Sequence, residues 1–224
     1  MSEFDLGPIW LSLKLAGLTT IVLLLIGTPL AWWLSFSRNR AKPVIEAMVA
    51  LPLVLPPTVL GFYMLILFSP NNPLGAAWVN LTGQTLTFSF SGLLIASVVY
   101  SFPFVVQPLQ SAFNSVGRAP LETAATLGAS PLDAFFSVVA PLSRHGFLTA
   151  VVLGFAHTIG EFGVVLMVGG NIPGRTRVVS IAVFENVETL NYTQAHVLSA
   201  GLIVFSFLVL LLVYGLNRRH ARAF

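Results

Sequence analysis

Two ionisable side chains stand in an otherwise apolar stretch. His157 and Glu161 are four positions apart, and residues 147–168 carry no other charged or titratable group. In a helix this spacing places both on one face, and an ionisable residue at membrane depth is a candidate functional residue. They form either part of a proton relay or a mutually satisfied buried pair that fixes packing beside Gly160 and Gly163. A relay needs further partners across the bilayer, and none is evident in the sequence.

Prolines interrupt two other apolar runs. One run contains Pro52, Pro56 and Pro57, and the run that follows contains Pro103 and Pro108. Each proline removes an amide donor and disturbs the hydrogen bond to the carbonyl four residues back, so both helices should kink or open. Open backbone at membrane depth is tolerated only where it is buried in protein or lines a watery cavity. The two segments are therefore predicted to wall a pathway, unless the prolines only shape the helices.

The other polar residues do not indicate catalysis. The 4 histidines are scattered, there is no cysteine, and no paired carboxylates or nucleophile motif occur in one segment. Disulfides, thiolate metal sites and thiol nucleophiles are thereby excluded. The 11 Lys and Arg residues give a net charge of +3 but form no sustained basic stretch. We expect no enzyme activity, no metal or cofactor bound by this chain, and no nucleic-acid partner.

Membrane helices must position these residues. Of the 224 residues, 56% are hydrophobic and 8% are charged, whereas about 25% are charged in a typical soluble domain. A hydrocarbon core about 30 Å thick needs roughly 20 apolar residues in a helix, and continuous rather than alternating hydrophobicity argues against barrel strands. We predict an all-α polytopic membrane protein, with residues 1–224 as a single transmembrane domain. Its five transmembrane helices are expected at residues 9–36, 45–68, 90–113, 147–168 and 197–216.

The basic residues give the expected orientation. Eight of the 11 Lys and Arg residues follow the first run, follow the third run or lie in the tail: Arg38, Arg40, Lys42, Arg118, Arg144, Arg218, Arg219 and Arg222. By the positive-inside rule the N-terminus is outside and the C-terminus is cytoplasmic, which five spans satisfy. On the outer side, Arg175 and Arg177 either help to dock an acidic partner, attract an anion, or lie in a solvated turn.

The segment at about residues 114–146 is predicted to form two short helices at a sharp corner. Pro120 can begin the first helix, and Glu122 suits its N-terminal turn. Gly128 can end that helix with a positive φ, and Ser130 with Pro131 can cap and begin the next. Such a protrusion suits insertion into a groove of another protein; the alternative is a surface helix that lies along the membrane.

The same segment resembles the docking loop of permease subunits of ATP-binding-cassette importers. Its residues E-T-A at 122–124, Gly128, and V-x-A-P at 138–141 are similar to the family pattern E-A-A-x-x-x-G-x9-I-x-L-P, from which Thr123, Val138 and Ala140 depart. The resemblance implies the importer-permease fold with a cytoplasmic coupling helix that docks into an ATP-hydrolysing subunit. The residues to which it assigns coupling are Glu122, Ala124, Ala125, Gly128 and Pro141.

Nearly the whole chain is similar to molybdate permease subunits. The resemblance rests on three segments: L-P-L-V-L-P-P-T-V-L-G at 51–61, S-F-P at 101–103, and G-E-F-G with G-N-I-P-G-R-T-R within 160–177. The resemblance implies molybdate transport across the bacterial plasma membrane by two copies of this chain, embedded in lipid. It also implies two cytoplasmic ATPase subunits, which use ATP and Mg, and an external oxyanion-binding protein. Sulfate and thiosulfate permeases usually have Tyr in place of Phe162, and sulfate, thiosulfate and tungstate are the alternative substrates.

The expected pathway binds its substrate only weakly and transiently. The residues assigned to it are Pro56, Thr58, Ser101, Pro103, His157, Thr158 and Glu161. The family often has Arg at the position of His157, which need not carry a charge near neutral pH. A dianion would therefore meet backbone amides and hydroxyls, with selectivity in the external partner. The alternative from another class is an ion-coupled secondary transporter that uses His157 and Glu161.

Overall fold

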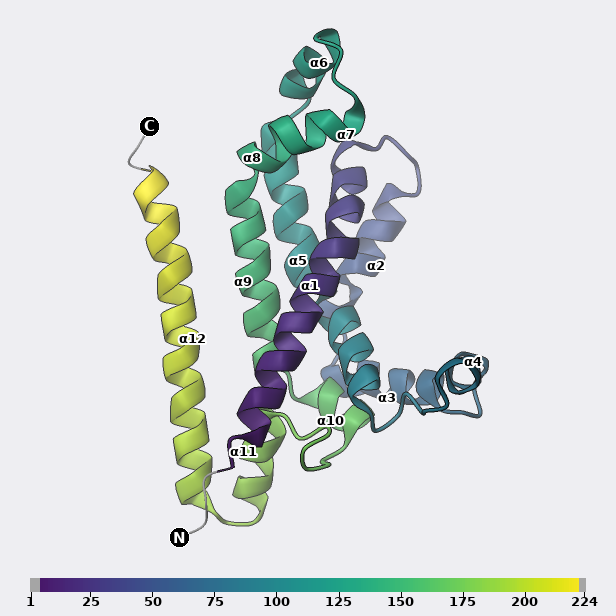
Figure 1. Ribbon diagram of the computed structural model, residues 1–224, viewed down its shortest axis with the longest axis vertical. Helices are drawn as coiled ribbons and strands as arrows, with labels where there is room; N and C mark the ends of the chain where they lie inside the picture. The colour runs from purple at the N-terminus through teal and green to yellow at the C-terminus, as the bar shows by residue number, and fades with distance from the viewer. Residues whose placement is uncertain (1–4, 222–224) are drawn as a thin grey trace.

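The protein is a bundle of long helices with short helices at both ends. Figure 1 shows a computed structural model, which describes residues 5–221, so that Arg222 of the predicted basic tail lies outside the described residues. The helices that run along the long axis are α1 (Gly7–Phe36), α2 (Lys42–Val54), α5 (Phe90–Val116), α9 (Arg144–Gly160) and α12 (Tyr192–Ala221). No strand occurs in the described part of the chain, and the all-α prediction is confirmed.

The short helices form two groups (Figure 1). At the end where α12 finishes lie α6 (Ala119–Thr126), α7 (Pro131–Ala134), a π-helical turn (Phe135–Val139) and α8 (Ala140–Leu142). Toward the end where α1 begins lie α3 (Pro57–Phe68), α4 (Pro73–Thr82), α10 (Gly163–Gly169) and α11 (Val179–Glu188). We refer to these as the α6 end and the α4 end.

Within residues 5–221, three helices are long and apolar enough to cross a membrane as they stand, namely α1, α5 and α12. Two bent helix pairs raise the number to as many as five. In one pair, α2 and α3 meet at 111°; in the other, the segment from α7 to α8 meets α9 at 75°. Because a helix rises about 1.5 Å per residue, α2 with its 13 residues is only about 20 Å long.

The predicted span over residues 45–68 opens at its prolines, as expected from them, because α2 ends at Val54 and α3 begins at Pro57. Leu55 is extended, and neither Pro56 nor Pro57 has an amide that could continue the helical ladder. The predicted helix over residues 147–168 is also interrupted: α9 ends at Gly160, and Glu161 is extended. No proline lies at this second break.

The helix α5 forms the centre of the bundle. It contacts α1, α2, α3, α9 and α10, and it stays one continuous helix although it contains Pro103 and Pro108. Its fully buried residues Val105, Leu109 and Phe113 belong to a core that also includes Leu23 and Leu34 of α1. The expected opening of this segment at its prolines does not occur, because packing on several sides holds the helix together.

Candidate functional site

The two helix breaks meet at one cavity. The break at residues 55–56 leads into α3, the break at residues 161–162 leads into α10, and α3 packs against α10. A cavity of about 550 Å³ lies at this junction, and α3, α5, α9, α10 and the second break all contribute to its wall. Its polar lining side chains are Thr58, Tyr100, His157 and Glu161.

Two glycines allow α3 and α10 to approach closely. A Cβ atom at Gly163 would lie 2.8 Å from Cβ of Pro57, and one at Gly61 would lie 2.7 Å from Cβ of Met167. Both distances are well below the roughly 3.5–4.0 Å of a carbon–carbon contact. The wall of the cavity therefore depends on the absence of side chains at these two positions.

A hydrogen-bonded chain joins α5 to α9 beside the cavity. Ser101 Oγ lies 2.9 Å from His157 Nδ1 and 3.0 Å from Thr158 Oγ1, and the Thr158 hydroxyl donates to the Gly154 carbonyl at 2.9 Å. A hydroxyl donates only one proton, so the three bonds together require Thr158 to accept from Ser101, and Ser101 to accept from Nδ1–H of His157. The imidazole ring stacks on Phe104, with ring centroids 3.8 Å apart. The ring is thus held in one orientation at the cavity wall.

Glu161 occupies the second break without a side-chain partner. Its side chain is 3% exposed, yet neither carboxyl oxygen has a hydrogen bond from any residue within 5–221. The hydroxyl of Ser97 lies beside it and is also unpaired. The break itself is fixed through the backbone, because the Ser180 hydroxyl of α11 donates to the Glu161 carbonyl at 2.5 Å.

His157 and Glu161 are not a mutually satisfied pair, and that interpretation was wrong. The imidazole bonds to α5 through Ser101, and the carboxyl has no bond. The physical reason is that α9 ends at Gly160, so the four-residue spacing no longer places Glu161 on the same helical face. Both side chains nevertheless line the same cavity.

The structure brings together most of the residues predicted for the pathway. Thr58, His157 and Glu161 line the cavity, and Ser101 and Thr158 belong to the chain of hydroxyls behind the imidazole. Pro56 caps α3 next to the lining, whereas Pro103 is buried inside α5 away from it.

Sequence reasoning missed the aromatic side chains of the site. Tyr100 lines the cavity with its ring centroid 4.9 Å from that of His157, and Phe104 stacks on the imidazole. Tyr100 and Phe104 lie one helical turn apart around Ser101, and this spacing places them on one face of α5. The four-residue spacing of these two aromatic side chains was the sequence signal that could have identified them.

The protrusion at the α6 end has the predicted local structure. Glu122 lies in the first turn of α6, Gly128 has φ +88°, and the Ser130 hydroxyl accepts a hydrogen bond from the Asp133 amide at the start of α7. Of the residues assigned to coupling, Glu122, Ala125, Gly128 and Pro141 are exposed and Ala124 is buried. The side chain of Leu127, beside the corner, is 83% exposed.

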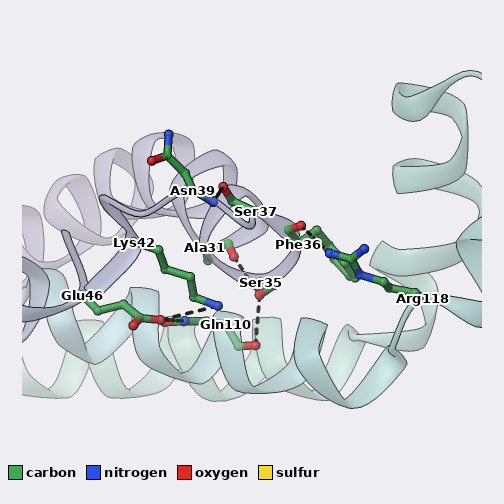
Figure 2. Close-up of polar contacts among 9 residues, drawn as sticks. All are labelled: Ala31, Ser35, Phe36, Ser37, Asn39, Lys42, Glu46, Gln110 and Arg118. Atoms are coloured by element: carbon green, nitrogen blue, oxygen red, sulfur yellow. Dashed lines mark hydrogen bonds and ion pairs between the residues drawn. The ribbon is translucent and has the colours of Figure 1, made fainter. Parts of the chain in front are cut away.

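The protrusion is anchored on α1 and α5. The Arg118 guanidinium donates to the carbonyl of Phe36, the last residue of α1, at 2.8 Å (Figure 2). Trp32 of α1 and Phe113 of α5 contact Phe135 edge to face, with ring centroids 4.7 Å and 6.0 Å away. These contacts connect the short helices to both long ones.

The two arginines at the α4 end have different surroundings. Arg177 forms an ion pair with Glu185 at 3.1 Å, and its Nε donates to Asn171 Oδ1 at 2.6 Å. Arg175 is exposed and lies in a turn, where its amide donates to the Ile172 carbonyl. Arg177 thus fixes the segment that leads to α11, while Arg175 is presented to the surroundings.

The arrangement provides a cavity lined by hydroxyls and an imidazole. Within residues 5–221, no group of three or more His, Asp or Glu side chains could hold a metal ion. The polar groups at the cavity are hydroxyls, one imidazole and one carboxyl, which can form hydrogen bonds to a passing solute.

Comparison with known proteins identifies the kind of protein. The family of binding-protein-dependent transport system inner membrane components matches residues 23–224. The chain is 58% identical over 218 residues to the molybdenum transport system permease protein ModB of Azotobacter vinelandii, covering 97% of this chain and 96% of the relative. It is 34% identical over 199 residues to the sulfate transport system permease protein CysT of Synechocystis, covering 89% of this chain and 69% of the relative.

The fold is also found among solved transporters. A chain of the MetNI methionine ABC transporter, solved in inward-facing conformations, superposes with a TM-score of 0.75 at 16% identity, over 98% of this chain and 99% of the other. At that identity the likeness concerns the fold alone. The sequence matches and the shared architecture agree, and the chain belongs to the family of binding-protein-dependent transport system inner membrane components, the permease subunits of ABC importers.

Proposed function

We propose that this chain is the permease subunit of an ATP-driven importer that moves molybdate across the bacterial plasma membrane. The observation that carries the proposal is the 58% identity, over almost the full length of both chains, to a molybdenum transport permease. Sulfate is the alternative oxyanion, because a sulfate permease is 34% identical over most of this chain. Thiosulfate and tungstate, also tetrahedral oxyanions, complete the set of candidate substrates.

The proposed topology has five spans, with the α6 end in the cytoplasm. The spans are α1, α2 with α3, α5, α9 and α12, so that each bent helix pair contributes one span. Its support is the distribution of charge, because Arg38, Arg40, Arg118 and Arg144 all lie at helix ends on the α6 side, where the positive-inside rule expects cations. The N-terminus is then external and the C-terminus cytoplasmic.

The proposed pathway passes the cavity at the two helix breaks. Backbone interruptions at membrane depth fit a place where the protein lines a hydrated passage rather than lipid. The hydroxyls of Thr58 and Tyr100 line the cavity and can donate hydrogen bonds to an anion without a strong fixed charge. Ser101 holds the imidazole of His157 in place behind them. The anion passes with brief contacts, and an external oxyanion-binding protein supplies selectivity.

In the proposed mechanism, ATP hydrolysis by separate partner subunits supplies the energy for transport. The exposed corner at Gly128 docks into an ATPase subunit, one for each of two permease copies, and ATP with Mg is used there. Closure of the two ATPases brings the two corners together and, through α5 and α9, opens the pathway outward. The anchoring of the protrusion by Arg118 and Phe135 supports this transmission.

Reconstitution of the complete importer tests the function. Proteoliposomes with two permease copies, the ATPases and the binding protein should take up labelled molybdate only with ATP, and excess sulfate should compete poorly. Uptake that needs no ATPase but follows a proton gradient would instead establish an ion-coupled transporter. Uptake of sulfate in preference to molybdate would reject the proposed substrate but would still support the assignment as an ATP-driven importer.

A further inference from the structure

We propose that the hydrogen bond between Gln110 and Glu46 transmits motion from the ATPase-docking protrusion to α2 and, through the first helix break, to the cavity wall. This inference rests on the proposed function, because it assigns a mechanical role within an ATP-driven cycle. Gln110 and Glu46 are then positioning residues. Neither contacts the cavity.

The helix α2 is loosely held compared with its neighbours. Of its 13 residues only Val49 and Pro52 are buried, and Val44, Met48, Leu51, Leu53 and Val54 are exposed. It packs mainly on α5. Within this chain α2 is therefore held by few contacts, so each of those contacts matters for its position.

Polar contacts hold the beginning of α2 (Figure 2). The Gln110 amide of α5 donates to Glu46 Oε1 at 2.6 Å, and Lys42 Nζ lies 3.8 Å from the same oxygen. Ser35 of α1 shares its one proton between the Ala31 carbonyl at 2.8 Å and the Gln110 carbonyl at 3.2 Å, so one residue of α5 contacts both neighbouring helices. The short bond to a carboxylate is of the charge-assisted kind, which is stronger than a neutral one.

The protrusion is continuous with the helix that carries Gln110. Gln110 lies six positions before the end of α5, and α6 begins three positions after that end. Arg118, in the connection, also bonds to the end of α1. A displacement of the protrusion therefore moves the end of α5, and with it the amide that holds Glu46.

The far end of α2 meets the cavity. After α2 ends at Val54, two residues lead into α3, whose first residues Pro57 and Thr58 line the cavity. Pro57 is in turn fitted against Gly163 of α10. Movement of α2 consequently shifts the start of α3 against α10. The hydrogen bond between Gln110 and Glu46 couples α2 to α5, the helix that leads into the protrusion.

Four variants in the reconstituted importer test the transmission. Gln110→Leu removes the donor at similar volume. The double variant Glu46→Gln with Gln110→Glu restores a donor and an acceptor in reversed order, and Glu46→Gln alone keeps an acceptor. Lys42→Ala is the matched control, because it removes the 3.8 Å ion pair and leaves the 2.6 Å bond. Molybdate uptake and ATP hydrolysis are measured in the same vesicles, and their ratio is the readout.

Gln110→Leu should keep ATP hydrolysis but lower the uptake per ATP by about tenfold, since a charge-assisted bond shifts an equilibrium by roughly that factor. The reversed pair and Lys42→Ala should stay within about twofold of the wild type. Glu46→Gln, which leaves a neutral bond, should fall between the wild type and Gln110→Leu. An unchanged ratio for Gln110→Leu would overturn the inference. So would failure of the reversed pair to recover, or a parallel loss of hydrolysis and uptake.

If the proposed function itself is wrong, the wild-type importer will not take up molybdate at all. This result differs from a failure of the transmission inference, in which the wild type transports and the variants do not differ as expected. The ratio would be measured with sulfate or tungstate, whichever stimulates ATP hydrolysis, and the same comparison of variants would decide the role of Gln110 and Glu46.

Discussion

Substitution of Gly61 by alanine should separate the two short helices that wall the cavity. The new Cβ would lie 2.7 Å from Cβ of Met167 and 3.2 Å from the backbone Cα of Val164. To restore a carbon–carbon contact of roughly 3.5–4.0 Å, α3 must move away from α10 by about 1 Å. The side chain of Val164 is fully buried, so α10 cannot easily retreat.

The cost should be that of overpacking a well-packed contact, about 1–3 kcal/mol. For a chain of this size, about 2 kcal/mol corresponds to a fall in Tm of roughly 4–8 °C. Uptake should fall as well, because α3 carries Thr58 on the cavity wall. A second variant at the same contact, Gly163→Ala, should behave alike, since its Cβ would lie 2.8 Å from Cβ of Pro57.

Thermal unfolding of the purified permease and uptake by the reconstituted importer are the measurements. Gly17→Ala is the matched control, because nothing lies within 4 Å of its new Cβ and it also sits in a helix. There alanine should leave Tm unchanged or raise it, since glycine in a helix interior is about 0.5–1 kcal/mol less favourable. If Gly61→Ala matched this control in both Tm and uptake, the close approach of α3 and α10 would be refuted.

Three further substitutions address other parts of the molecule. Gly128→Trp, at the exposed corner with φ +88°, should abolish ATP-driven uptake while membrane insertion persists; normal uptake would reject docking at this corner. Ser12→Ala should cost about 1–3 kcal/mol in unfolding free energy, because the buried amide of Val179 loses its acceptor at 2.8 Å; an unchanged Tm would contradict this. Ser101→Ala should lower uptake by about 3- to 10-fold, because it frees the imidazole of His157; retained uptake would argue against the hydroxyl chain.

Local signals in the sequence predicted the features that depend on a few adjacent residues. The corner of the protrusion is one example, because Gly128 adopts a positive φ and Ser130 caps the next helix, as their residue types favour. The break before α3 is another, since two consecutive prolines cannot continue a helical ladder.

Features that depend on distant packing were not predictable in this way. Pro103 and Pro108 remain within one helix, because α5 is enclosed by several neighbours. The break at Glu161 occurs without a proline, and its backbone is held by Ser180 from another helix. The bond between Gln110 and Glu46 joins residues 64 positions apart and has no spacing signature. Periodicity and residue type carry no information about such partners.

The packing of α3 on α10 also constrains how the chain is made. The two helices are about a hundred residues apart along the chain, and at about 5–20 residues per second a ribosome needs roughly 5–20 s to cover that distance. During this interval α3 is already synthesised but lacks α10, the helix against which it packs most extensively. During biogenesis, α3, a short helix that begins at a proline, must therefore stay near the translocon or pack temporarily against the helices already made. The fold is complete only when α10 has been synthesised.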